Sequence, residues 1–283
     1  MDRWLVSVAR IVGAGIGAFA GLVAVQLMRL RRMEFLPGHP GFYVNHVVHP
    51  TSATPHPPRL RLAMLGDSTT AGVGVERAED SLPYQLARRL ADHHARDVHV
   101  VSYGWAGARV ADVLQAQVPR ALEPLRTSET QPFLARVDVI AIVIGSNDAT
   151  HNTPRRRFRA ELREVLAAVR AANPQAQVVL AGIPAFRGAL RAIEPLIFLA
   201  DQYAHLLRPV SRAEAERIGA AYADLAREVP KRIDPATPFL SDDQFHPSAA
   251  GYAIWADVIF EALVAAPSTV EPAVGGSLQA SGA

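Results

Sequence analysis

The stretch Leu60-Arg61-Leu62-Ala63-Met64-Leu65-Gly66-Asp67-Ser68 (residues 60–68) decides the fold of this chain. Residues 60–65 form a short apolar run with the length of a buried strand, and Gly66 permits a tight turn directly after it. Ser68 therefore lies at the carboxyl end of the strand, where open α/β sheets bind their ligands. Taken alone, a serine in such a turn is more readily explained as a helix cap. Its function therefore depends on the rest of the chain.

Four further apolar runs follow this strand, and stretches with helical spacing separate them. The runs span 98–103, 137–144, 178–183 and 220–225, and the helical stretches include 82–90, 110–118 and 158–169. Strands that alternate with helices indicate a parallel sheet covered on both faces. We expect one three-layer α/β/α domain at residues 59–266, built on a five-stranded parallel sheet.

The composition is that of an ordinary globular protein, and it excludes several kinds of site. Of the 283 residues, 49% are hydrophobic and 20% are charged, and the formal net charge is only +2. The chain has no cysteine, which excludes a disulfide scaffold, a thiolate metal site and a cysteine nucleophile. The histidines show no spacing typical of metal ligands, and the basic run at 155–159 lacks a nucleic-acid-binding motif. We expect no cofactor, no metal and no nucleic-acid partner.

The N-terminal region, residues 1–35, carries an apolar stretch. Residues 11–28 are interrupted only by Gln26, and arginines flank the stretch on both sides. The length is close to the ~18–20 residues that cross a bilayer as a helix. A single membrane anchor is the favoured interpretation, and a cleaved signal peptide, which would give a secreted protein, or a helix packed on the domain are the alternatives. Because positive charge lies on both flanks, the sequence does not assign the side of the membrane.

Two segments without sustained periodicity complete the chain. Residues 36–58 contain six prolines and several histidines and are typical of a linker. Residues 267–283 are rich in glycine and other small residues, which predicts a flexible tail.

Two later segments carry the chemistry that Ser68 lacks on its own. Gly145-Ser146-Asn147-Asp148 follows the third strand, and Asp243-Gln244-Phe245-His246 precedes the last helix. A serine hydroxyl is a weak nucleophile at neutral pH and needs a general base. A histidine with a carboxylate nearby supplies one, because the carboxylate fixes the tautomer and stabilises the imidazolium that forms. The three segments together predict a catalytic serine.

These segments resemble the conserved blocks of the SGNH (GDSL-type) hydrolases. Residues 66–69 match the first block, with Thr69 where the family often has leucine, and residues 145–148 and 243–246 match the third and fifth blocks. The second block is looser and spans residues 101–107. Within it, Gly107 aligns better than Gly104 with the family's oxyanion glycine, and Ser102 stands where many members have asparagine.

The resemblance implies a fold, a reaction and a set of roles. The sheet would have the strand order 2-1-3-4-5, and the protein would be a serine esterase for carboxylic esters with small or lipid-like acyl groups. Ser68 would attack the ester, His246 would accept its proton and Asp243 would orient His246. The oxyanion hole would consist of the backbone N–H groups of Ser68 and Gly107 and the side-chain amide of Asn147.

Two other functions are compatible with the same residues. An acyltransferase or deacylase that acts on a sugar or lipid hydroxyl could use the same triad, and an inactive membrane-tethered binding module is the less favoured alternative. Among the neighbouring residues, we expect Asp67 to stabilise the turn and Asp148 to accept backbone hydrogen bonds. His151 could be exposed or contact substrate, and Trp105 could pack in the core or line the substrate pocket.

Overall fold

A computed structural model of the chain describes residues 2–32, 43–51, 54–55, 57–125, 131–186 and 194–267. Its strands are β1 (Asn45–Val48), β2 (Leu60–Gly66), β3 (Val98–Ser102), β4 (Val139–Val143), β5 (Gln177–Ala181) and β6 (Ala221–Ala223). Its α-helices are α1 (Asp2–Arg32), α2 (Leu82–His94), α3 (Val110–Asp112), α4 (Val118–Ala121), α5 (Ser146–Thr150), α6 (Arg155–Ala172), α7 (Leu196–Arg217), α8 (Leu225–Glu228) and α9 (Ala249–Ala265). A π-helical turn, η2 (Val113–Gln117), joins α3 to α4, and 3-10 turns η1 (Ala78–Asp80), η3 (Leu134–Arg136) and η4 (Val229–Lys231) lie in the connections.

The six described strands form one mixed sheet in the order β1-β3-β2-β4-β5-β6. Five of them, β3-β2-β4-β5-β6, are parallel, which is the order 2-1-3-4-5 that the family resemblance implies. The strand that carries the site, β2, lies between β3 and β4 in the interior of this sheet. The order reverses beside β2, and a doubly wound sheet opens a crevice at the carboxyl ends of its strands where the order reverses.

The sixth strand corrects two expectations. β1 pairs antiparallel with β3, with Asn45 opposite Val101 and Val48 opposite Val98. The sheet is therefore mixed rather than purely parallel, and residues 45–48 belong to the domain rather than to a linker. Val44 and Val48 are buried, and the strand covers the N–H and C=O groups that would otherwise be exposed along the edge of β3.

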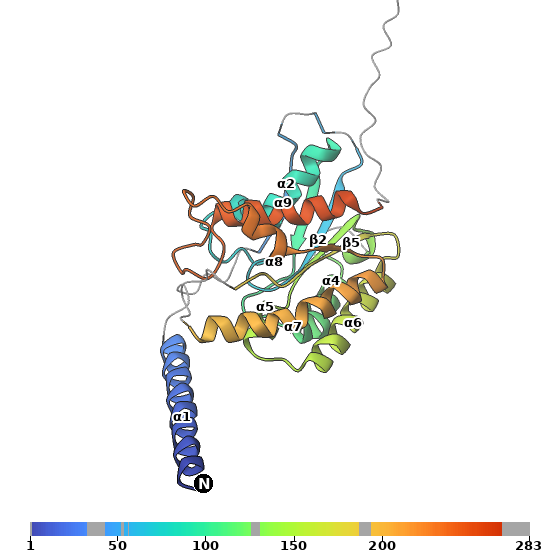
Figure 1. Ribbon diagram of the computed structural model, residues 1–283. Helices are drawn as coiled ribbons and strands as arrows, with labels where there is room; N and C mark the ends of the chain where they lie inside the picture. Colours follow the sequence, from blue (N-terminus) through green and yellow to red (C-terminus); the bar gives the residue numbers. More distant parts are fainter. Residues whose placement is uncertain are drawn as a thin grey trace, which may run out of the picture.

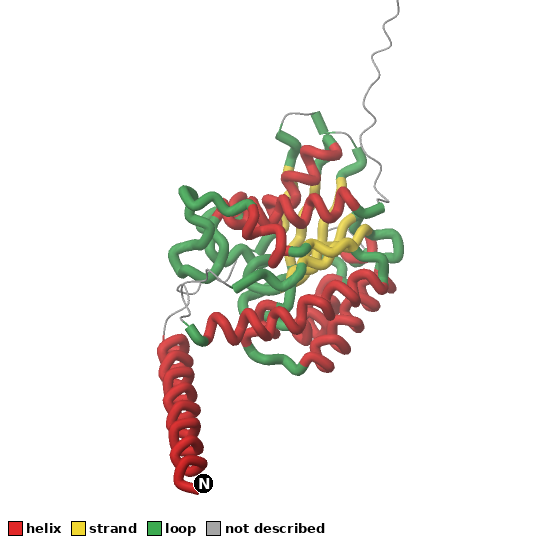
Figure 2. Tube along the Cα trace, viewed as in Figure 1, coloured by secondary structure: helices red, strands yellow, loops and turns green. Residues whose placement is uncertain are grey.

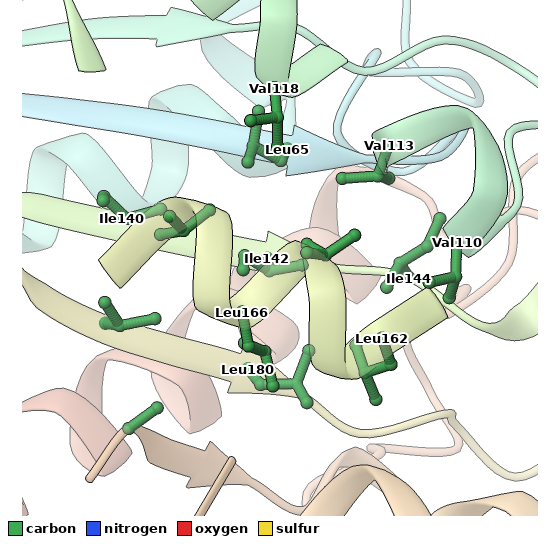
Figure 3. Packing of buried hydrophobic residues seen from close by; sticks show 14 of the residues in the cluster. Leu65, Val110, Val113, Val118, Ile140, Ile142, Ile144, Leu162, Leu166 and Leu180 are labelled. Carbon is green, nitrogen blue, oxygen red and sulfur yellow. The ribbon is translucent and has the colours of Figure 1, made fainter. Parts of the chain in front are cut away.

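Helices cover both faces of the sheet (Figure 1). On one face α6 and α7 pack over the parallel strands; Leu162 and Leu166 of α6 meet Ile142 of β4 and Leu180 of β5 in this layer (Figure 3). On the other face α2 and α9 pack against each other and against the sheet. These two apolar layers confirm the three-layer α/β/α fold.

The N-terminal helix α1 stands apart from the two layers (Figure 1). Within it, the segment Val6–Gln26 is 21 residues long with a mean hydropathy of 2.0. The domain does not cover this segment apart from its last residue. There Gln26 is 4% exposed and its Nε2 donates a hydrogen bond of 2.7 Å to the backbone oxygen of Glu194, just before α7. Among the described helices, this one is long and apolar enough to cross a membrane. The tail expected at 267–283 lies outside the described residues from 268 onward.

Candidate active site

Ser68 lies in a tight turn that leaves the carboxyl end of β2, and residues 66–74 are called the nucleophile turn below. The turn closes on itself through bonds from the N–H groups of Ala71 to Asp67 O (3.1 Å) and of Val73 to Ser68 O (3.0 Å). The Ser68 side chain is buried to 8% exposure. The strand ends at Gly66. A Cβ at this residue would lie 2.1 Å from the backbone oxygen of Val143, so only glycine fits this position.

His246, the predicted general base, lies in the segment between η4 and α9, and residues 239–248 are called the histidine loop below. The loop is closed by a bond of 2.9 Å from Ser241 N to His246 O and ends where the Ser248 hydroxyl accepts from Gly251 N at 3.2 Å. The loop lies on the stretch of chain between α8 and α9 in Figure 1, and Figure 2 draws such loops in green. It reaches the nucleophile turn directly, because a Cβ at Gly74 would lie 2.9 Å from the Cβ of His246.

The structure brings together Ser68, His246 and Asp243 as a hydrogen-bonded chain. His246 Nε2 lies 2.9 Å from Ser68 Oγ, and His246 Nδ1 lies 2.5 Å from Asp243 Oδ2. An ionised carboxylate can only accept, so Nδ1 carries the proton and Nε2 is left to accept from the serine hydroxyl. This is the tautomer that a general base for Ser68 needs.

Asp243 is held as an anion although it is buried. Burial by itself would raise the pKa of its carboxyl group, but the His246 ring and backbone N–H and the Phe245 N–H hold that pKa well below its ordinary value. The two N–H groups and the Ser241 hydroxyl all donate to Oδ1, at 2.8–2.9 Å. Four donors on one carboxylate fix its orientation as well as its charge, and through it the orientation of the imidazole.

Asn147 lies at the start of α5, directly after β4. Its Nδ2 donates a hydrogen bond of 2.9 Å to the backbone oxygen of Ala108, which ties the third predicted block to the residue that directly follows the second. A side-chain amide has two N–H groups, so the second one is available to a substrate. Asn147 and Ser68 line the same cleft.

Gly107 is exposed in the loop between β3 and α3, beside Ala108. Its φ is +82°. A Cβ built on it would have no described atom within 4 Å other than those of Gly107 itself and of the two residues next to it in the chain. Gly104 has a different role, because a Cβ there would lie 3.0 Å from the backbone oxygens of Gly66 and Asp67. Gly104 thus lets the second block pack against the nucleophile turn, while Gly107 is the glycine with open space before it. Gly107 is not among the residues that line the cleft, and its role as an oxyanion donor stays a prediction.

Two further buried carboxylates support the site without entering the triad. Asp67 accepts hydrogen bonds from the N–H and the hydroxyl of Thr69 at 3.0 and 2.8 Å, and Asp148 accepts from the N–H of Val110 at 3.0 Å. Burial raises the pKa of both carboxyl groups. Asp67 therefore stabilises the turn, as expected, and Asp148 holds the start of α3 against α5.

The remaining candidate residues lie away from the reacting atoms. His151 is exposed, and its Nδ1 lies 2.8 Å from the backbone oxygen of Asn147. Trp105 packs against the buried cluster under α6 and α7. Neither residue lines the cleft. Within the described parts of the chain, no group of three or more histidine or acidic side chains is arranged to hold a metal ion.

A cleft of about 830 Å³ opens at Ser68 and extends along the histidine loop. Most of its wall is apolar and includes residues that the sequence analysis did not assign to the site, among them Phe186, Leu225, Val229, Ile233, Phe239 and Trp255. These residues come from several loops and from α8 and α9, so they share no spacing that could have identified them. Apolar walls with a few polar groups at one end are typical of a site for small molecules.

Comparisons with known proteins agree with this geometry. Residues 64–254 match the GDSL-like lipase/acylhydrolase family. The chain belongs to this family. It thus has the SGNH hydrolase fold and belongs to a family of lipases and acylhydrolases.

Individual relatives are distant. The chain is 28% identical over 208 residues to a GDSL-like esterase of Mycobacterium tuberculosis, a match that covers 72% of this chain and 62% of that protein. The chain therefore spans less than two thirds of the length of this curated relative. Among solved structures, it resembles the lipase Lip_vut3 from a goat rumen metagenome (TM-score 0.57, 18% identity, 72% of this chain and 97% of the other) and the acetylxylan esterase Axe2 of Geobacillus stearothermophilus (TM-score 0.51, 22% identity, 72% and 94%). At these identities the structural likeness supports the fold alone.

Proposed function

We propose that this family member is a serine esterase that hydrolyses carboxylic esters through an acyl-enzyme on Ser68. The observation that carries the proposal is the chain of contacts from Ser68 Oγ to His246 Nε2 (2.9 Å) and from His246 Nδ1 to Asp243 Oδ2 (2.5 Å). Ser68 and His246 both line a cleft with mostly apolar walls, so an ester bound there would meet an activated nucleophile.

The residues divide the reaction into two steps. Ser68 Oγ attacks the ester carbonyl while His246 Nε2 takes its proton, and Asp243 stabilises the imidazolium that results. The oxyanion of the tetrahedral intermediate accepts from the N–H groups of Ser68 and Gly107 and from the second N–H of Asn147. His246 returns the proton to the leaving alcohol, and then activates a water molecule that hydrolyses the acyl-enzyme.

The cleft favours an ester with an apolar acyl group. Its wall beyond Ser68 is formed mainly by aliphatic, aromatic and proline side chains, which stabilise a hydrocarbon chain by removing it from water. We infer from the size of about 830 Å³ that the site accepts acyl groups longer than acetyl.

We further propose that α1 anchors the enzyme in a membrane. The apolar, uncovered segment Val6–Gln26 supports this, and the bond from Gln26 to Glu194 keeps the end of the helix against the domain. Carbonate extraction of membranes tests the proposal: an anchored chain stays in the membrane pellet with its N-terminus intact, whereas a chain that is released without its N-terminal apolar segment would show a cleaved signal peptide instead.

The function is tested by measuring hydrolysis of p-nitrophenyl acetate, butyrate and decanoate by the detergent-solubilised full chain. Ser68→Ala should lower kcat by at least ~10³-fold, because the nucleophile is lost while the oxyanion hole stays. Ser146→Ala is the matched control, since Ser146 lines the same cleft and has no role in the triad. Full activity in the Ser68→Ala protein would contradict the proposal. If an added alcohol receives the acyl group faster than water does, the enzyme is an acyltransferase that uses the same acyl-enzyme.

A further inference from the structure

The side chain of Gln117 holds both backbone polar groups of Gly66, the residue that begins the nucleophile turn. Gln117 Oε1 accepts from Gly66 N at 2.8 Å, and Gln117 Nε2 donates to Gly66 O at 2.7 Å. Gln117 is completely buried and lies 51 residues away along the chain. The carbonyl and the amino group of one buried side chain thus bond the N–H and the C=O of the same residue. Loss of either bond would leave a buried backbone group without a hydrogen-bond partner, which is unfavourable.

The topology of the sheet explains why Gly66 needs such a partner. On one side Gly66 pairs with Val143 of β4. On the other side the pairing with β3 ends at Met64 and Ser102, and Tyr103 N makes the last bond to Met64 O. In a strand, every second residue directs its N–H and C=O groups toward the same neighbouring strand. Met64 and Gly66 therefore both face the β3 side, but β3 has already turned away from the sheet at the level of Gly66. The Gln117 amide takes the position of the missing β3 peptide.

The local conformation of the chain brings Gln117 to this position. Gln117 is the last residue of the π-helical turn η2, between α3 and α4. A π-helical turn is rare and costs hydrogen-bond quality, and such turns occur frequently at functional sites. Val113 and Val118 around it are buried against Leu65, the neighbour of Gly66 (Figure 3). The packing therefore holds the amide at the end of β2.

We propose that Gln117 is a positioning residue for catalysis: by completing the hydrogen bonds of Gly66, it fixes the direction in which the chain leaves β2 and so the place of Ser68 Oγ. Residue 66 has to be glycine because a Cβ there would clash with the backbone oxygen of Val143. The backbone of glycine is less restricted than that of any other residue. The restraint therefore comes from outside the turn. The inference rests on the proposed role of Ser68 as nucleophile.

The test compares kcat and KM for p-nitrophenyl butyrate in full-length Gln117→Met and Gln117→Glu with the wild type. Methionine keeps the volume and removes both hydrogen bonds, whereas glutamate keeps an acceptor for Gly66 N–H and, when protonated, a donor for Gly66 O. Asn173→Leu is the matched control. Asn173 is also a buried amide that bonds backbone groups, with Val137 O at 2.8 Å and Ala176 N at 3.1 Å, but it lies at the amino ends of β4 and β5, whereas Gly66 lies at the carboxyl end of β2.

We expect Gln117→Met to lower kcat by about 10- to 100-fold with KM within about threefold of the wild-type value, because a displacement of ~1 Å at a catalytic group costs up to ~10²-fold. Gln117→Glu should lie between Gln117→Met and the wild type, and its kcat relative to the wild type should rise as the pH is lowered and the new carboxyl group gains its donor. Asn173→Leu should lower the Tm and leave kcat within about twofold.

A Gln117→Met enzyme with wild-type kcat, or an Asn173→Leu enzyme with an equal loss of kcat, would overturn the proposal. If Gln117→Met does not fold, Gln117→Glu provides the test: a kcat below that of the wild type that recovers relative to the wild type as the pH is lowered supports the proposal, and a wild-type kcat at all pH values overturns it. If the wild type hydrolyses no ester but Ser68 reacts with a fluorophosphonate, only the proposed function fails, and the labelling rate replaces kcat in the same comparison. A Ser68 that is inert in both assays overturns both.

Discussion

The nucleophile turn and the histidine loop each bury one aspartate, and the pKa values of the two carboxyl groups are shifted in opposite directions. Burial raises the pKa of Asp67, which has the N–H and hydroxyl of Thr69 as its hydrogen-bond donors. Burial also acts on Asp243, but the His246 ring and the backbone N–H groups of Phe245 and His246 hold its pKa well below the ordinary value. The number and charge of the donors, rather than burial, decide whether a buried carboxylate works as an anion. Asp243 therefore serves the imidazole, and Asp67 serves the turn.

The largest difference between the two carboxylates should appear on removing the charge of Asp243. Asp243→Asn should lower kcat by about 10³- to 10⁴-fold, because an amide no longer requires the proton on Nδ1 of His246 and no longer stabilises the imidazolium. Asp242→Asn is the control, since Asp242 is the exposed neighbour in the same loop and should change kcat by less than about threefold. Steady-state kinetics at pH 7.5 measure both. An Asp243→Asn enzyme with a tenth or more of wild-type activity would show that His246 is oriented without the carboxylate.

A second difference concerns stability against acid. The pKa of Asp243 is lower in the folded protein than in the unfolded chain, so its contribution to stability is complete above the unfolded value of about 3.9 and is lost as the pH falls from there toward the folded value. The free energy of unfolding, measured by urea titration between about pH 6 and pH 2.5, should therefore fall more steeply in the wild type than in Asp243→Asn. Parallel curves for the two proteins would be inconsistent with a depressed pKa.

The smallest effect is expected at Asp67. The Oδ1 of asparagine can accept the same two bonds from Thr69, and the substitution removes a buried charge. Asp67→Asn should therefore change kcat by less than about threefold and leave the Tm equal or slightly higher at neutral pH, since a raised pKa means that burial of the ionised form is unfavourable. Kinetics and thermal unfolding on the same preparation check this. A loss of kcat of ~10²-fold or more would move Asp67 from the turn into the catalytic machinery.

The sequence predicted most of the fold because the parallel strands are continuous apolar runs. Buried strands such as 137–144 and the helical stripe that contains Leu162 and Leu166 are local patterns, and they lie in the structure where the pattern places them. β1 was missed because its four residues stand in a proline-rich segment without alternation. It forms because the edge of β3 offers backbone partners, which is a tertiary effect. A soluble fragment should for this reason retain residues 43–58 rather than begin at Arg59.

Of the candidate site, the sequence predicted only the residues that are proposed to take part in the reaction. Ser68, Asn147, Asp243 and His246 stand in short segments next to strands or helices, so the sequence could identify them together. The walls of the cleft come from several loops and from α8 and α9, and residues brought together from separate segments share no spacing in the sequence. Gln117 was missed because its partner is a backbone group 51 residues away, and a lone glutamine in a helical stretch has no distinctive sequence context. Both omissions concern contacts that exist only after the chain has folded.

The acyl-enzyme itself is the most direct test of the account. The full chain is mixed rapidly with p-nitrophenyl butyrate, quenched in acid, digested and analysed by mass spectrometry. The account predicts one butyryl group, on the peptide that contains Ser68, formed in a burst of p-nitrophenol and absent from Ser68→Ala and much slower to form in His246→Ala. A butyryl group on Ser146 or another residue of the cleft, or turnover without any covalent adduct, would contradict the assignment of Ser68 as the nucleophile.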